Sequence, residues 1–330
     1  MKARRTKRIC TLLILPISLF FAGCGDGPET PAGESSSGGK VLKIGFAQAG
    51  AESAWRRAET GSVKAEALKR RHQLKFADAQ GKQEAQIAAV RDFIAQGMDA
   101  IILAPIVETG WDDVLGEAKD AGIPVVLIDR GVEVKDENLY ATLIASDFVY
   151  EGKLAGEWLA KNTQGKARII ELEGTPGSAP AIDRKKGFDA VVDQHEGMSI
   201  IASQSGEFNI EKGKEVMEAL LAKHADAVTA VYAHNDDMAL GAIQALEAAG
   251  KTPGKDVIVL SIDGGKAALN KLVDGQLSCV VECLPLLGPA AFDAVEKILA
   301  GETLEKWQRV DDQLFDATNT DAAFVEARPF

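Results

Sequence analysis

Positive charge is scarce in this sequence. Its 37 lysines and arginines are outnumbered by 49 aspartates and glutamates, which leaves a formal net charge of −12. A nucleic-acid backbone demands a basic surface, so this balance argues against nucleic acid as a partner. The 330 residues are 46% hydrophobic and 26% charged, which is globular composition over the length of about two domains.

Short motifs of common enzymes and metal sites are also missing. We find no GxSxG nucleophile elbow, P-loop, GxGxxG, HExxH or CxxC motif, and the histidines are scattered. We therefore expect no enzymatic activity, no cofactor and no metal. One enzymatic alternative stays open, because paired Asp or Glu side chains can hydrolyse glycosides.

The N-terminus differs from the rest of the acidic chain. Residues 1–8 carry basic side chains and no acidic one, and residues 9–22 form a mostly apolar run. That run is shorter than the roughly 20 residues that a membrane-spanning helix needs. A basic segment, an apolar segment and then small residues are typical of a secretory signal, which we predict for residues 1–23.

The segment Phe21-Ala22-Gly23-Cys24 resembles a bacterial lipobox, in which the Cys becomes the lipidated first residue of the mature chain. We predict lipidation of Cys24, with ordinary cleavage and a free thiol as the alternative. Gly, Pro, Ser and Glu dominate the residues that follow, which is the composition of a flexible tether. Residues 24–40 are thus predicted to be a lipidated Cys and its tether.

Cysteine is rare, and the two cysteines outside the N-terminal region lie close together. Cys279 and Cys283 occur in the sequence CVVEC. If this segment is a strand, the two residues are about 13 Å apart, which is beyond the reach of a disulfide. We expect two buried free thiols.

From Val41 onward, short apolar segments alternate with stretches that have helical spacing of Ala, Leu and Glu. Strands that are apolar on both faces and separated by helices predict parallel sheets covered on both sides. Five strands followed by five more predict two similar doubly wound α/β lobes. The expected strands are 41–47, 74–78, 100–104, 124–129, 139–145, 168–173, 199–203, 230–233, 257–263 and 277–283, and the expected helices lie near 53–71, 83–96, 111–121, 148–162, 181–194, 211–224, 238–249 and 286–300.

Several predicted strands end in polar side chains rather than in an ordinary turn. An exposed Asp–Arg ion pair contributes little to the free energy of unfolding. Polar groups that directly follow an apolar strand, however, lie at the carboxyl edge of the sheet, where ligands bind in such folds. We therefore expect these groups to contact a ligand. They are Asp129 at the end of the strand at 124–129 and Arg130 directly after it, Asn235 near the end of 230–233, and Asp263 at the end of 257–263.

For three other charged residues, a role without a ligand is the alternative to ligand contact. Asp236 and Asp237 begin the helix expected near 238–249, and a helix N-terminus favours negative charge, so capping is the alternative to ligand contact. Arg184 lies beside Lys185 and Lys186, where a surface arginine would be unremarkable.

Trp55 is the aromatic candidate for a ligand contact. It follows Ser53, a good N-cap residue, and its helix has a set of small and apolar residues whose spacing predicts the core face. Trp55 falls outside that set, so we expect it to point into the crevice, with packing on a loop as the alternative. An indole face suits the C–H face of a sugar ring, and carboxylates and guanidinium groups suit its hydroxyls. The set is Ala54, Ala58, Gly61, Ala65 and Leu68.

These motifs together resemble the periplasmic sugar-binding proteins of bacterial ABC importers, the type I binding proteins related to ribose-binding protein. The resemblance covers the chain from Val41 and rests on KIGF, ESAWR, VVLIDR, AIDRKKGF, AHNDDMALGAIQA, SIDG and VVECLP. The HNDDMALGA and IDG motifs are family-wide. ESAWR, TGWDDVL and SQSGEF are narrower and resemble the galactofuranose-binding branch.

The resemblance implies a sugar site between two lobes that three crossings connect. It implies a first lobe of 41–145 plus 284–303 and a second of 146–283 plus 304–330. Ribose-binding relatives carry a Gln where this chain has Cys283, and Glu282 beside it is added as a hypothesis. The implied substrate-binding residues are Glu52, Trp55, Arg56, Asp129 and Arg130 from the first lobe, and Arg184, Phe208, Asn235, Asp263 and Glu282 from the second.

The resemblance also implies a function. The chain would be a monomer outside the cytoplasm, periplasmic or at the cell surface, anchored through Cys24, that captures a monosaccharide by hinge closure and delivers it to ABC permease subunits. Galactofuranose or galactose is the expected sugar. The alternatives are a pentose such as ribose or arabinose, or a sensor subunit for a chemoreceptor or histidine kinase. A repressor would carry a helix-turn-helix before the first strand, where this chain has a signal and a tether.

Replacing Cys24 by Ser is expected to release the protein from the membrane, because the thiol that would carry the lipid is lost. Cell fractionation followed by immunoblotting measures this. A Cys10→Ser variant is the control, since Cys10 leaves with the signal peptide. A Cys24→Ser protein that stayed in the membrane fraction would contradict lipidation.

Overall fold

The computed structural model describes residues 40–330. The predicted signal peptide, the lipidation of Cys24 and the tether as far as residue 39 lie outside the described residues. Between residues 40 and 330, no helix combines the length and the apolar character needed to cross a membrane.

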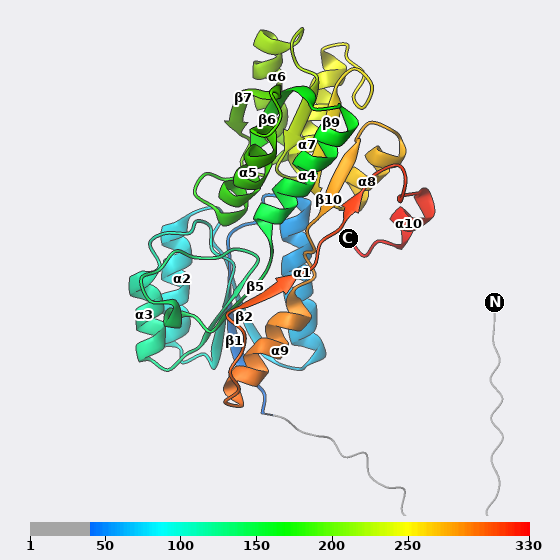
Figure 1. The fold of residues 1–330 in the computed structure, drawn as a ribbon. Coiled ribbons are helices and arrows are strands. Elements are labelled where there is room, and N and C mark those ends of the chain that lie inside the picture. The colour runs from blue at the N-terminus through cyan, green and yellow to red at the C-terminus, as the bar shows by residue number, and fades with distance from the viewer. Residues whose placement is uncertain (1–39) are drawn as a thin grey trace, which may run out of the picture. The chain divides into compact units, whose positions relative to one another are not determined.

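Strands and helices alternate along nearly all of the described chain (Figure 1). Every strand and helix expected from the sequence is present, with ends shifted by a few residues. The elements are β1 (Lys43–Gln48), α1 (Ala54–Lys69), β2 (Gln73–Asp78), α2 (Gln83–Ala95), β3 (Ala100–Leu103), α3 (Asp112–Asp120), β4 (Val125–Ile128), η1 (Glu137–Leu139), β5 (Thr142–Ser146), α4 (Phe148–Asn162), β6 (Lys166–Glu173), α5 (Ala179–Val192), β7 (Gly197–Ser205), α6 (Ile210–His224), β8 (Ala230–Ala233), α7 (Asp236–Ala248), β9 (Ile258–Asp263), α8 (Lys266–Val273), β10 (Cys279–Glu282), α9 (Gly288–Leu299), β11 (Trp307–Val310), β12 (Leu314–Phe315) and α10 (Ala322–Ala327). The sequence-based prediction missed η1, α8, β11, β12 and α10.

The two sheets share one strand order. The first runs β2-β1-β3-β4-β5-β11 and the second β7-β6-β8-β9-β10-β12. All neighbours are parallel except β12, which runs antiparallel to β10. The predicted pair of doubly wound lobes is therefore confirmed, and each lobe has its topological switch point beside its first strand, where ligands bind in such sheets.

Helices cover both faces of each sheet because successive strand residues point to opposite sides. In β3, Ile102 packs with α1 and α9, whereas Ile101 packs with α2 and α3. In the second sheet, α4 and α5 cover the face that includes Tyr232, and α6, α7 and α8 cover the face that includes Val231. Both faces are thus mostly apolar, and the polar side chains of the cavity come from the strand ends and the segments that follow them.

Three segments connect the lobes, and the last one differs from the prediction. The chain leaves the first lobe after β5, returns after β10 into α9, and crosses again between β11 and β12. The sequence-based assignment of all of 304–330 to the second lobe is wrong, because β11 pairs with β5 of the first sheet. The physical reason is that β5 would otherwise present an unpaired edge.

Glycines allow close contact between α4 and α5 of the second lobe. A Cβ atom on Gly152 would lie 2.0 Å from the carbonyl oxygen of Arg184, and one on Gly187 would lie 2.0 Å from that of Val149. Because the Arg184 backbone is involved, this packing also holds a predicted site residue in place.

Gly152→Ala is expected to destabilise the protein by about 1–3 kcal/mol, since the added methyl group forces the two helices apart. Gly61→Ala is the matched control: Gly61 is an exposed glycine in α1 with nothing near its Cβ position, so alanine should stabilise the helix by about 0.5–1 kcal/mol. Urea unfolding followed by circular dichroism measures both. Equal stability of Gly152→Ala and the wild type would contradict the close helix contact.

Candidate functional site

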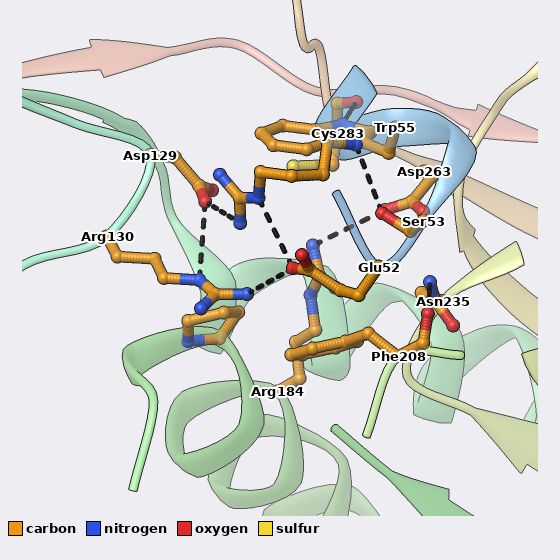
Figure 2. A pocket seen from close by; sticks show the side chains of 12 residues that line it. Glu52, Ser53, Trp55, Asp129, Arg130, Arg184, Phe208, Asn235, Asp263 and Cys283 are labelled. Atoms are coloured by element: carbon orange, nitrogen blue, oxygen red, sulfur yellow. Dashed lines mark hydrogen bonds and ion pairs between the residues drawn. The ribbon is translucent and has the colours of Figure 1, made fainter. Parts of the chain in front are cut away.

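A cavity lies where the carboxyl ends of the strands of both sheets meet (Figure 2). Its wall combines carboxylates, guanidinium groups and two aromatic rings, and residues from both lobes contribute. The lining residues are Glu52, Ser53, Trp55, Arg56, Asp129, Arg130, Pro180, Arg184, Phe208, Asn235, Asp263 and Cys283.

Nine of the ten residues proposed from the sequence line this cavity; the exception is Glu282. The Glu282 carboxylate instead pairs with Arg328 at 2.5 Å and accepts a hydrogen bond from Gln313 at 2.9 Å. The alternation of β10 is the reason, because Val281 and Cys283 face the α4–α5 side whereas Glu282 faces the other side. Contact of the nine residues with a ligand stays a prediction.

Helix α1 brings Trp55 to the cavity, but not for the reason given from the sequence. The predicted core face is wrong, since Leu68 is 80% exposed and the buried face carries Trp55, Arg56, Glu59 and Val63. The small residues that defined the predicted face lie toward solvent. Trp55 is on the buried side of the first turn, where that side meets the cavity, and its Nε1 donates to the carbonyl oxygen of Cys283 at 2.6 Å.

Arg56 is the centre of the charged wall in the first lobe. The Ser53 hydroxyl caps α1 by accepting from the backbone N–H of Arg56 at 3.0 Å. The buried guanidinium donates to Asp129 and to Glu59, each at 2.6 Å, and lies 3.4 Å from Glu52. A buried cation needs such compensation, because burying an unpaired charge costs several kcal/mol.

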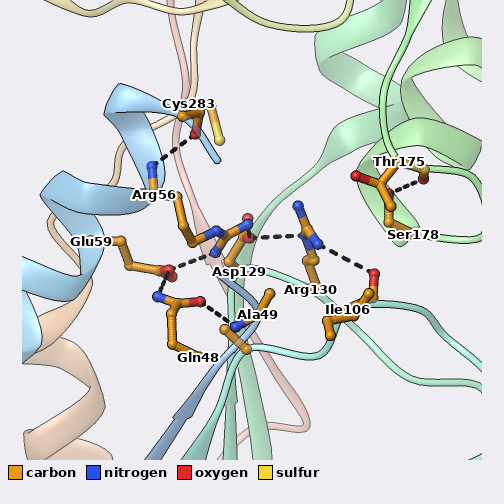
Figure 3. A network of polar contacts seen from close by, with 12 residues as sticks. Gln48, Ala49, Arg56, Glu59, Ile106, Asp129, Arg130, Thr175, Ser178 and Cys283 are labelled. Atoms are coloured by element: carbon orange, nitrogen blue, oxygen red, sulfur yellow. Dashed lines mark hydrogen bonds and ion pairs between the residues drawn. The ribbon is translucent and has the colours of Figure 1, made fainter. Parts of the chain in front are cut away.

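Arg130 and Glu59 continue this network (Figure 3). Arg130 donates to the carbonyl oxygen of Ile106 at 3.2 Å and lies 3.4 Å from both Glu52 and Asp129. Burial and the neighbouring Arg56 lower the pKa of Arg130 to about 10. Burial and the nearby Asp129 carboxylate raise the pKa of Glu59 to about 7, against the effect of Arg56.

The second lobe has a comparable buried guanidinium, Arg184. It donates to Glu151 at 2.7 Å and to the carbonyl oxygen of His234 at 2.6 Å, and it lies 3.9 Å from Asp263. Burial and the Asp236 carboxylate raise the pKa of Asp263 well above its usual value. Burial thus shifts Asp263 toward its neutral form, and a neutral carboxyl group both donates and accepts hydrogen bonds.

Phe208 lies between the two charged walls. Its ring centroid is 5.4 Å from the guanidinium carbon of Arg130 and 6.0 Å from that of Arg184, which are cation–π distances. The backbone carbonyl of Phe208 accepts from Asn235 at 3.2 Å. Asn235 is also the N-cap of α7, because its side chain accepts from the backbone N–H of Met238.

The backbone is strained at three of the predicted residues. Asp129, Phe208 and Asp263 have positive φ angles of 60°, 58° and 123°. Residues other than glycine rarely adopt this region, and such residues cluster at functional sites. At each of these residues the positive φ angle changes the direction of the backbone, and all three side chains line the cavity between the lobes.

The two acidic residues after Asn235 have roles that the sequence did not predict. Asp236 accepts from Ser261 at 2.5 Å and from the backbone N–H of Gly265 at 2.8 Å, within its own lobe. Asp237 accepts from the backbone N–H of Ala54 in the other lobe at 3.0 Å. Asn235 is the N-cap of α7, and Asp236 and Asp237 lie in the first turn of that helix, where negative charge is favoured as expected.

Sequence analysis did not propose three residues of the cavity wall: Ser53, Pro180 and Cys283. Ser53 carried only a capping signal, and nothing in the sequence distinguished Pro180. For Cys283 the available signals were its place where ribose-binding relatives carry a Gln, and the alternation of side chains along β10. Cys279 and Cys283 are both buried and free, as expected.

The cavity suits a small, neutral, hydroxyl-rich ligand. Carboxylates and guanidinium groups lie side by side, so the wall offers many acceptors and donors together with aromatic faces. Each hydroxyl of a sugar both donates and accepts, which matches this mixture, and aromatic rings match the C–H faces of a sugar.

Glu59 predicts a pH dependence of stability. Its pKa is raised from 4.5 to about 7, so the folded protein holds this proton more tightly than the unfolded chain. The associated stability is present at low pH and is lost as the pH rises from about 4.5 to about 7. The melting temperature of Glu59→Gln should therefore fall less between pH 5 and pH 8 than that of the wild type.

Differential scanning fluorimetry across this pH range measures the effect. Glu66→Gln is the control, because hydrogen bonds from Arg70 lower the pKa of Glu66 and it titrates below this range. Identical slopes for Glu59→Gln and the wild type would contradict the assignment.

Comparison with known proteins gives the chain a family. The model of the periplasmic binding protein domain matches residues 44–303. The galactofuranose-binding protein YtfQ of Escherichia coli (strain K12) is 52% identical over 259 residues, which are 78% of this chain and 81% of that protein.

Solved structures agree with this assignment. A galactofuranose-binding protein has a TM-score of 0.84 and 48% identity, and the match covers 86% of this chain and 97% of the other. The binding protein of the arabinose ABC transporter of Shewanella sp. ANA-3, bound to α- and β-L-arabinofuranose, has a TM-score of 0.84 and 48% identity, covering 87% and 95%. The predicted resemblance is confirmed: the chain belongs to the periplasmic binding protein family.

Proposed function

We propose that this chain is the substrate-binding subunit of an ABC sugar importer. It captures galactofuranose or galactose outside the cytoplasm and delivers the sugar to the permease subunits. The proposal includes attachment to the membrane through a lipidated Cys24 and action as a monomer. No chemistry on the sugar is part of this role.

One observation carries the proposal. Both lobes of a chain that is 52% identical to a galactofuranose-binding protein direct buried charged and aromatic side chains into one cavity.

Binding proceeds by closure of the lobes over the sugar. An open form exposes the two polar walls to water, and a sugar that contacts both walls favours the closed form because those contacts exist together only there. In the closed arrangement Arg130 of the first lobe lies over Phe208 of the second. The permease then recognises the closed form.

Selectivity follows from burial of the polar wall. Arg130 is almost fully buried and its Nε makes no hydrogen bond within the described residues, so a sugar epimer that fails to meet it leaves a polar group unsatisfied. Such a group costs about 1–3 kcal/mol, which is about a 5- to 150-fold loss of affinity.

A pentose is the second candidate ligand. The similar structure from Shewanella sp. ANA-3 holds L-arabinofuranose, which shares the five-membered ring of galactofuranose and lacks one carbon. The first measurement therefore compares hexoses with pentoses directly.

We expect a galactofuranose source or galactose to raise the melting temperature of the purified 25–330 chain the most. At 1,000 times Kd the stabilisation is about 4 kcal/mol, which a thermal-shift assay detects readily. The panel also contains arabinose, ribose, glucose and xylose. A larger shift with arabinose would favour the pentose candidate.

Two variants connect this shift with the cavity. Trp55→Ala removes the aromatic wall, and Asp129→Asn removes a carboxylate while keeping its size, so both should lose most of the sugar-dependent shift. Asp136→Asn, at an exposed loop position, should keep it. No shift with any sugar in the wild type would contradict the proposed function.

Two further experiments distinguish the importer role from a sensor subunit and from a glycosidase. Deletion of the gene should abolish sugar uptake; a strain that still imports the sugar but loses a chemotactic or transcriptional response would favour the sensor role. Release of product from an aryl galactofuranoside by the purified protein would favour a glycosidase.

A further inference from the structure

A hydrogen bond outside the cavity joins the two lobes. The Asp237 carboxylate of the second lobe accepts from the backbone N–H of Ala54 in the first lobe at 3.0 Å. Neither residue lines the cavity, so this contact does not depend on which sugar is bound.

The N-terminus of α1 needs this partner. The first N–H groups of a helix have no acceptor within the helix, and the cap residue Ser53 serves only the N–H of Arg56. Ala54 is the first residue of α1, and its N–H is met by Asp237. A carboxylate is well suited to this place, because the helix dipole makes the N-terminus positive.

The bond joins the two helix turns that carry much of the cavity wall. Ala54 is followed directly by Trp55 and Arg56, and Asp237 lies two residues after Asn235. When the lobes separate, Ala54 and Asp237 must part as well, whereas each lobe can keep its internal bonds.

Asp237 is largely buried in the closed arrangement. Burial raises its pKa, whereas the N–H of Ala54 and the charge of Arg57 favour the ionised form; Glu211 and Glu52 oppose it. A buried carboxylate without a partner is costly, so the bond to Ala54 contributes to the closed form in particular.

We propose that Asp237 is a positioning residue that holds the closed form and thereby sets the affinity for every sugar by the same factor. This inference rests on the proposed function, because it assumes that sugar binds by closure. If the closed form is populated less, every apparent Kd rises in proportion, and the ratio of two Kd values stays constant.

A second contact between the lobes limits the expected effect. The backbone N–H of Glu108 in the first lobe donates to the carbonyl oxygen of Gly177 in the second at 3.0 Å, and no side-chain substitution removes it. Loss of the Asp237 bond should therefore weaken closure without abolishing it.

Isothermal titration calorimetry and stopped-flow fluorescence on the 25–330 chain test the inference. Asp237→Ala should bind galactose and arabinose about ten- to a hundredfold more weakly, by the same factor for both. The loss should be in faster dissociation, because the bond forms only after closure. Asp237→Asn keeps an acceptor oxygen and should recover part of the affinity. Glu215→Ala, an exposed acidic position on α6, should match the wild type.

The outcomes separate this inference from the proposed function. A loss of affinity for one sugar alone, or affinities within about twofold of the wild type, would overturn the role of Asp237 while the proposed function stands. Absence of sugar binding by the wild type would overturn the proposed function. That result would overturn this inference as well, because the inference assumes that sugar binding drives closure.

Discussion

The fold depends on keeping two buried guanidinium groups compensated, one in each lobe. Arg56 is neutralised by Asp129 and Glu59, which requires α1 to pack on the first sheet, and Arg184 is neutralised by Glu151, which requires α5 to pack on α4. Hydrophobic residues of similar volume would often be at least as stable as buried ion pairs. The buried charges are therefore not explained by stability alone, and the proposed function gives them a role in ligand recognition.

The parallel sheet keeps each lobe rigid, and the three crossings allow one lobe to move relative to the other. Strands supported on both faces hold the strained residues at their ends, such as Asp129 and Asp263. The three crossings are linked by one chain of contacts: the Cys283 thiol lies 3.7 Å from the Ser146 hydroxyl, which donates to Asp312 at 3.0 Å. Closure can thus move two rigid lobes about a small cluster of side chains.

The candidate site was predicted well where it depends on strand ends and poorly where it depends on packing. Asp129, Arg130, Asn235 and Asp263 follow apolar strands, and the carboxyl ends of parallel strands meet at one edge. The buried face of α1 was predicted wrongly, because this helix buries charged residues such as Glu59 and leaves alanines exposed. A pattern that assumes apolar burial fails wherever the interior is polar.

The sequence by itself determined the class of this protein: the alternation of apolar strands and helices, the polar strand ends and the family motifs are local features that hold without knowledge of contacts. Only the tertiary structure decided which side chains meet. Glu282 pairs with Arg328 of the C-terminal tail, β11 joins the first sheet, and Asp237 reaches Ala54 in the other lobe. Each of these depends on a partner far away in the chain, and such pairings are set by the packing of whole elements rather than by the neighbours of a residue in sequence.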